Sequence, residues 1–162
     1  MMTEDYVSFE TAKLLKDKGF SEWCSKCYGV AVLHNGTDIS FDEECDLKDN
    51  GREDEIEYVE GGRLYDYGCN NRDKDAKAWA APTLWVAMKW LREVHHWHIF
   101  VIPRWEDVEY MPGEWQDEMT GYQYVIVSVG EVNRKNEQPI TKALTPESAY
   151  ESAIKYRLEN LI

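Results

Sequence analysis

Residues 82–95 carry the pattern that most constrains the fold, because they predict one complete amphipathic helix. Pro82 and Thr83 are typical of the first positions of a helix. Apolar side chains then recur at the spacing that places them on one face, at Leu84, Ala87, Met88, Leu91 and Val94. A helix with one apolar face has to bury it against another element, so the chain needs a core on this side.

Two other segments predict helices with clear ends. Ser8 can accept a hydrogen bond from the first turn of a helix over residues 8–19, and Gly19 can end that helix. Thr145 and Pro146 begin a third helix, which we expect to continue to residue 162.

Residues 28–34 and 37–41 predict the first pair of strands. They flank Asn35-Gly36, a pair of residues that is typical of two-residue hairpin turns. Further along the chain, Gly61-Gly62 predicts a loop.

A second pair of strands is expected over residues 97–102 and 122–129, with Pro103 ending the first of them. Hairpins without regular β-α-β crossovers favour an antiparallel sheet with helices on one face. A chain of 162 residues, 43% of them hydrophobic, is large enough to bury a core. We therefore predict a single α+β domain over residues 1–162, with a mostly antiparallel sheet and about three helices packed against it.

Negative charge is concentrated in residues 42–60. The formal net charge of the chain is −13, and this segment holds ten acidic and two basic residues, a net charge of −8. Such a chain disfavours binding to nucleic acid or anionic membranes and favours a partner with a basic surface. A dense carboxylate surface can imitate a nucleic-acid backbone and occupy a basic site on a host protein. The candidate residues are Glu43, Glu44, Asp54 and Glu55, and the alternative interpretation is a solvated charge run.

Seven tryptophans are more than a small core commonly needs, so some are expected at the surface. Trp85 falls on the polar side of the predicted helix with Arg92, and Trp105 follows Arg104 in a predicted loop. Such side chains can anchor a protein partner or stack on a base. The same four residues define a second hypothesis, a pocket that sequesters a small nucleotide-like ligand. Edge aromatics that cover a small core are the simpler interpretation, and Trp79 and Trp115 are further surface candidates.

Cys24 and Cys27 are separated by two residues, the spacing that lets two thiolates bind one zinc ion. Cys45, Cys69 or a histidine would complete the site, and the sequence holds no second CxxC pair. A zinc-binding module is therefore a third hypothesis, and four unligated thiols are the alternative.

No motif in the sequence indicates catalysis. Three histidines lie together where the predicted helix passes into the next strand, at positions 95, 96 and 98. Helix and strand geometry would point His95, His96 and His98 in different directions. The sequence holds no serine nucleophile elbow, phosphate-binding glycine loop or dinucleotide fingerprint. It also holds no apolar run of membrane-spanning length and no signal-peptide pattern. We expect a cytoplasmic protein that works by binding.

Three segments carry a further signal: residues 7–16 with Lys18-Gly19-Phe20, residues 81–83 with 87–95, and residues 149–154. Together they resemble a family of small uncharacterised proteins from phages and prophage-like regions of gut Bacteroidales. The resemblance implies this order of helices and a phage origin. Because that family has no assigned activity, the resemblance implies no catalytic residue. The leading hypothesis is a phage accessory protein that binds a basic surface of a host protein.

Overall fold

The computed structural model describes residues 5–128, 130, 136–137 and 142–160. These residues form four α-helices and mostly antiparallel strands, which confirms the predicted α+β class. The chain divides into two compact units: unit 1 contains Met1–Leu14 and Pro82–Ile162, and unit 2 contains Leu15–Ala81. The assignment of the whole chain to a single domain stays a prediction.

Unit 2 is built around one central strand. That strand, β1 (Cys27–His34), pairs antiparallel with β2 (Thr37–Asp38), β3 (Ile56–Tyr65) and β4 (Trp79–Ala80). The helix α2 (Phe41–Asp49) and the short 3-10 helix η1 (Glu53–Glu55) connect β2 to β3. The predicted turn at Asn35-Gly36 is confirmed, because His34 pairs with Thr37 across it.

Three sequence predictions in unit 2 were wrong. The second strand ends at Asp38 rather than Phe41, because Ser40 and Glu43 form a reciprocal capping box that begins α2. Gly61 and Gly62 lie inside β3 rather than in a loop. They are the extra residues of a bulge opposite Gly29 and Val30, and Gly61 has a φ of 67° that favours glycine.

Trp79 is also not a surface residue, since only 7% of it is exposed. It lies in β4, and its ring is 5.6 Å from the Lys16 ammonium group.

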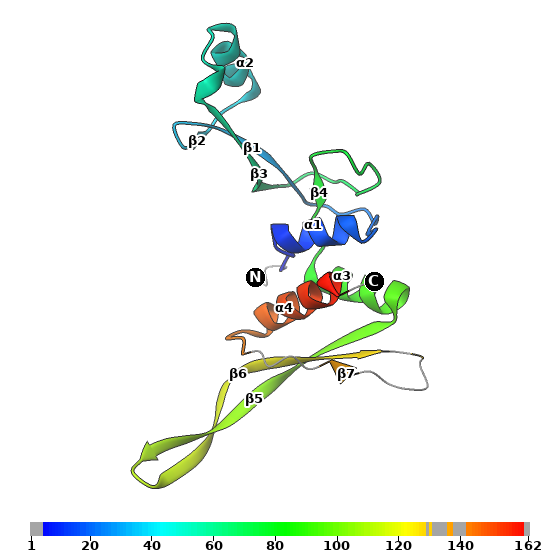
Figure 1. The fold of residues 1–162 in the computed structure, drawn as a ribbon, viewed down its shortest axis with the longest axis vertical. Helices are drawn as coiled ribbons and strands as arrows, with labels where there is room; N and C mark the ends of the chain where they lie inside the picture. The colour runs from blue at the N-terminus through cyan, green and yellow to red at the C-terminus, as the bar shows by residue number, and fades with distance from the viewer. Residues whose placement is uncertain (1–4, 129, 131–135, 138–141, 161–162) are drawn as a thin grey trace. The chain divides into compact units, whose positions relative to one another are not determined.

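Unit 1 combines a long β-hairpin with helices (Figure 1). The strands β5 (Trp97–Met111), β6 (Glu114–Ser128) and β7 (Asn136–Glu137) form a sheet in that order. The helices α3 (Leu84–His95) and α4 (Pro146–Glu159) pack against β5, and α4 also packs against β6. The first helix, α1 (Phe9–Asp17), begins in unit 1 and crosses the boundary between the units.

The predicted helix starts are confirmed. The hydroxyls of Ser8, Thr83 and Thr145 each accept a hydrogen bond from the backbone N–H three residues later, at 3.3, 3.3 and 3.1 Å. Gly19, with a φ of 92°, ends α1 as expected. No helix among the described residues is long and apolar enough to cross a membrane.

The hairpin of β5 and β6 is much longer than the sequence predicts. Pro103 does not end the strand but lies within β5, opposite Tyr122. A proline is tolerated here because β5 is an edge strand. Its backbone nitrogen, which lacks a hydrogen to donate, can lie on the side of the strand that has no neighbouring strand. The part of the hairpin beyond Pro103 extends past α3 and α4 (Figure 1). Trp105 is therefore on a strand, not in a loop.

Glu151 of α4 joins the start of α1 to α4. Its Oε1 accepts hydrogen bonds from the Ser8 backbone N–H at 3.0 Å, from the Ser8 hydroxyl and from the Thr11 hydroxyl. One carboxylate thus satisfies a free backbone donor of α1 and two side chains far away in sequence.

Replacing Glu151 by alanine should lower the free energy of unfolding by about 2 kcal/mol, because partly buried donors lose a charged acceptor. Glu151→Gln keeps an acceptor and should lose less. The matched control is Glu10→Gln, which removes an exposed ion pair with Lys155 on the same two helices and should change stability little. Urea denaturation of the full chain measures all three. Equal stability of Glu151→Ala and the control would show that the Glu151 contacts contribute nothing.

Candidate functional site

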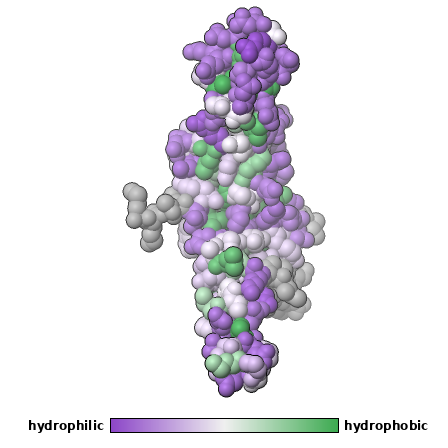
Figure 2. Space-filling view, turned by 90° about the vertical axis from the view of Figure 1, so that its left-hand side faces the viewer, coloured by the Kyte–Doolittle hydropathy of each residue, from purple (hydrophilic) through white to green (hydrophobic). Residues whose placement is uncertain are grey.

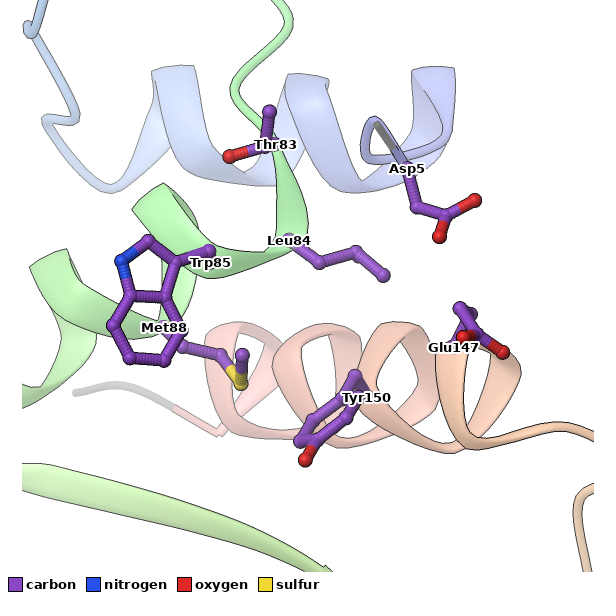
Figure 3. A pocket seen from close by; sticks show the side chains of 7 residues that line it. All are labelled: Asp5, Thr83, Leu84, Trp85, Met88, Glu147 and Tyr150. Atoms are coloured by element: carbon purple, nitrogen blue, oxygen red, sulfur yellow. The ribbon is translucent and has the colours of Figure 1, made fainter. Parts of the chain in front are cut away.

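A pocket of about 360 Å³ lies in unit 1 where the starts of α3 and α4 face the segment before α1 (Figure 3). The residues that line it combine two acids, two aromatic rings and apolar side chains: Asp5, Thr83, Leu84, Trp85, Met88, Glu147 and Tyr150. Asp5 and Glu147 lie at one end and Trp85 at the other, with Met88 and Tyr150 between them. No lysine or arginine is among these lining residues.

Backbone hydrogen bonds hold Asp5 at the pocket. The Asp5 carbonyl accepts from the Leu84 N–H at 2.9 Å, and the Val7 N–H donates to the Pro82 carbonyl at 3.0 Å. The segment before α1 therefore pairs with the residues that begin α3. Glu147 comes from the first turn of α4, where the helix dipole favours an acidic side chain.

Trp85 is exposed, as the sequence predicts. Its exposed fraction is 65%, and it projects from the side of α3 that does not enter the core. The Arg92 guanidinium lies 6.0 Å from the centre of its ring, so the predicted proximity of these two residues is also confirmed.

A second hollow of about 250 Å³ adjoins the pocket and shares Trp85, Met88 and Tyr150 with it. Its other lining residues come from α3 and β5 and include Arg92 and His98. The first pocket thus contains the acidic side chains, Asp5 and Glu147, whereas the second hollow contains Arg92 and His98.

The prediction that Arg104 and Trp105 join Trp85 and Arg92 in one pocket stays a prediction. Neither residue lines these two hollows. Both lie further along β5, where Arg104 binds the Glu106 carboxylate at 2.9 Å. Trp105 is 62% exposed, which confirms its predicted position at the surface.

The outer part of the hairpin gathers acids and aromatic residues on one face. Trp105 pairs with Met119, Asp107 with Asp117, and Glu109 with Trp115. Residues directly opposite one another project to the same side, and alternate residues of a strand share a face. We call this set the hairpin face: Trp105, Asp107, Glu109, Trp115, Asp117 and Met119. All six residues are exposed, and Figure 2 shows hydrophilic and apolar residues side by side at this end of unit 1.

Asp107 and Asp117 lie opposite one another at the centre of the hairpin face. The pKa of Asp107 is raised above its usual value because its carboxyl hydrogen-bonds Asp117 and faces the charge of Asp117. Like charges directly across two strands are unfavourable. A bound cationic group would relieve this repulsion.

Three of the four predicted acidic site residues are engaged within unit 2. Glu43 accepts from the Ser40 backbone N–H at 2.8 Å. Glu44 accepts from Lys48 and from the Tyr58 hydroxyl, both at 2.7 Å. The pKa of Glu55 is lowered to about 2 by its hydrogen bonds to Arg52 and His34. Asp54 is exposed and makes no hydrogen bond or ion pair with the described residues.

Other carboxylates of this segment form a regular surface. Asp42, Asp46 and Asp49 are exposed and lie along one side of α2 at intervals of four and three residues. The α2 end of unit 2 is mostly hydrophilic on the side shown in Figure 2. The sequence identified the acidic segment, but not which carboxylates face the solvent together.

The cysteines form a partial cluster. Cys24 and Cys69 exchange two backbone hydrogen bonds at 2.8 and 3.0 Å, and the Cys27 thiol hydrogen-bonds Tyr67 and Cys69. Cys45 lies apart in sequence on α2. Within the described residues, no group of three or more His, Cys, Asp or Glu side chains is arranged to hold a metal ion. The zinc site stays a prediction.

The three histidines have separate surroundings. The His95 ring contacts the Trp90 ring edge-on, with 4.5 Å between the two ring centres. Burial and the nearby charge of Arg157 lower the pKa of His95. His96 is exposed and ends α3 in the left-handed conformation, while His98 stacks on Phe100.

No protein-family model, curated protein or solved structure matched this chain in three comparisons.

Sequence reasoning missed the hairpin face and the acidic end of the pocket. The alternation of Trp105, Asp107 and Glu109 is visible in the sequence and could have indicated the hairpin face. Asp5 and Glu147 are far apart in the sequence, and only the packing of unit 1 brings them together.

The thiols of Cys24 and Cys69 should react slowly with iodoacetamide. Burial raises the pKa of Cys24 to about 11 and, with the Cys27 hydrogen bond, that of Cys69 to about 12. At pH 8 the thiolate fraction of Cys24 should therefore be about 100-fold below that of an ordinary thiol, and labelling should accelerate as the pH rises toward 11. Mass spectrometry of timed samples measures this, with the chain in 8 M urea as the control. Rapid labelling of Cys24 or Cys69 in the folded chain at pH 8 would contradict it, whereas labelling of Cys45 on α2 would not.

Proposed function

We propose that this chain is a cytoplasmic binding protein whose partner is a protein with a basic surface. The single observation that carries the proposal is the hairpin face, which combines exposed aromatic side chains with carboxylates that form no ion pair with the described residues. Residues 105–119 contain six acidic residues and no lysine or arginine.

Charge complementarity identifies the kind of partner. Asp107 and Asp117 repel each other across the strands, and a lysine or arginine side chain placed between them would replace repulsion with two favourable contacts. Trp105 and Trp115, 62% and 61% exposed, flank this position and can pack on the stem of such a side chain or bind its cation.

The acidic side of α2 supports the same function. Asp42, Asp46 and Asp49 give unit 2 a second surface that attracts basic partners. Glu43, Glu44 and Glu55 have structural roles, so we assign the binding in this unit to the aspartates of α2 and to Asp54.

A small-ligand function is the second candidate, favoured by the hollow that Trp85 and Arg92 line together. An indole and a guanidinium beside a hollow can stack on a base and bind a phosphate of a nucleotide-like ligand. The phage origin, and with it a host protein as the partner, rests on the sequence resemblance. Zinc binding by Cys24 and Cys27 remains a third proposal, supported only by their spacing.

Neutralising the hairpin face should abolish partner binding. The variant carries Asp107→Asn, Glu109→Gln and Asp117→Asn, all at exposed positions. A glutamine amide oxygen can still accept the hydrogen bond that the Gly113 N–H donates to Glu109 at 2.7 Å. Tagged chains are used to capture proteins from cells, and the captured proteins are quantified by mass spectrometry. Proteins with basic surfaces should fall at least about tenfold for this variant, because close charge pairs at an interface contribute several kcal/mol.

The matched control carries Asp17→Asn, Glu22→Gln and Asp75→Asn, which remove the same charge from exposed positions outside both acidic surfaces. It should capture the same proteins as the unchanged chain. Equal losses of captured protein in both variants would show that net charge alone explains the binding. No loss in either variant would refute a role for the hairpin face.

A further inference from the structure

We infer that the pocket between Asp5, Glu147 and Trp85 is a binding site for an alkylammonium group, the protonated amine of a small organic molecule or of a lysine side chain. This site is separate from the hairpin face, and it adjoins the hollow beside Arg92, with which it shares Trp85, Met88 and Tyr150. It extends the chain's function to a specific class of ligand.

The acidic end of the pocket provides the charge. Asp5 and Glu147 come from segments far apart in sequence, yet both line the same pocket, and neither side chain forms a hydrogen bond or ion pair with the described residues. Two carboxylates can each accept a hydrogen bond from one ammonium group, and such charge-assisted bonds are among the stronger ones in proteins.

The rest of the pocket fits the carbon chain of the ligand. Leu84 is buried at 7% exposure, and Met88 and Tyr150 lie between the acidic end and Trp85 (Figure 3). Methylene groups can pack on these side chains, and the aromatic rings of Trp85 and Tyr150 attract cations. A volume of about 360 Å³ falls in the range of small-molecule sites.

A helix-dipole role for Glu147 explains only part of this arrangement. An acidic residue in the first turn stabilises α4 without any ligand. That role explains neither Asp5, which precedes α1, nor the exposed indole of Trp85 at the other end of the pocket.

Arg92 restricts where the cation can bind. It lines the adjoining hollow, 6.0 Å from the centre of the Trp85 ring, and repels a second positive charge there. The ammonium group is therefore directed to the end formed by Asp5 and Glu147, and an anionic ligand such as a nucleotide is disfavoured at that end.

Isothermal titration calorimetry on the full chain tests the site. The probes are spermidine, N-acetyl-lysine methylamide, and adenosine monophosphate as an anionic comparison. We expect saturable one-to-one binding of at least one amine, and the tighter of the two identifies the source of the amine as a free molecule or a protein side chain. Adenosine monophosphate should not compete with the amine.

Variants separate this site from general attraction to an acidic protein. Asp5→Asn with Glu147→Gln should weaken amine binding at least tenfold, and Trp85→Ala should weaken it as well. Arg92→Gln should leave it unchanged or tighten it. The neutralised hairpin variant loses more charge than the pocket double variant but should bind the amine normally.

Either of two results would overturn the inference. One is the absence of saturable amine binding by the unchanged chain at millimolar concentrations. The other is equal weakening by the hairpin variant and by the pocket variant, with melting temperatures showing that both remain folded.

Discussion

The arrangement of unit 1 depends on the carboxylate of Glu151. It accepts hydrogen bonds from Ser8 and Thr11, which ties the start of α1 to α4. The backbone pairing of Asp5 and Val7 with the residues around Pro82 then ties the same segment to the start of α3. These contacts place Asp5 opposite Glu147, two acids that the sequence separates by most of its length. The pocket therefore forms because the segment before α1 is held against both α3 and α4.

The acidic residues of the chain divide into those that stabilise the fold and those that remain available. Glu43 caps a helix, and Glu44 and Glu55 are paired with cations. Asp107 and Asp117 instead face each other at a cost in electrostatic energy, beside exposed tryptophans. This unfavourable charge beside exposed aromatic side chains is our reason for proposing the hairpin face as a binding surface.

Local sequence signals predicted α1, α3 and α4, because caps such as Ser8, Thr83 and Thr145 act within one turn. They missed α2. They failed at Pro103, where the position of β5 at the sheet edge decided the outcome, and at Gly61-Gly62, where a bulge replaced a loop. The exposure of Trp85 followed from helical periodicity. The grouping of site residues did not, since it depends on strand register and on contacts between distant segments.

Zero-length crosslinking tests the central claim most directly, because a carbodiimide joins a carboxylate only to an amine in direct contact with it. The chain is purified with its bound proteins, treated with the carbodiimide, and analysed by peptide mass spectrometry. We predict crosslinks between lysines of a basic partner and Asp107, Glu109 or Asp117. Crosslinks that join the partner only to carboxylates outside the hairpin face would contradict the account.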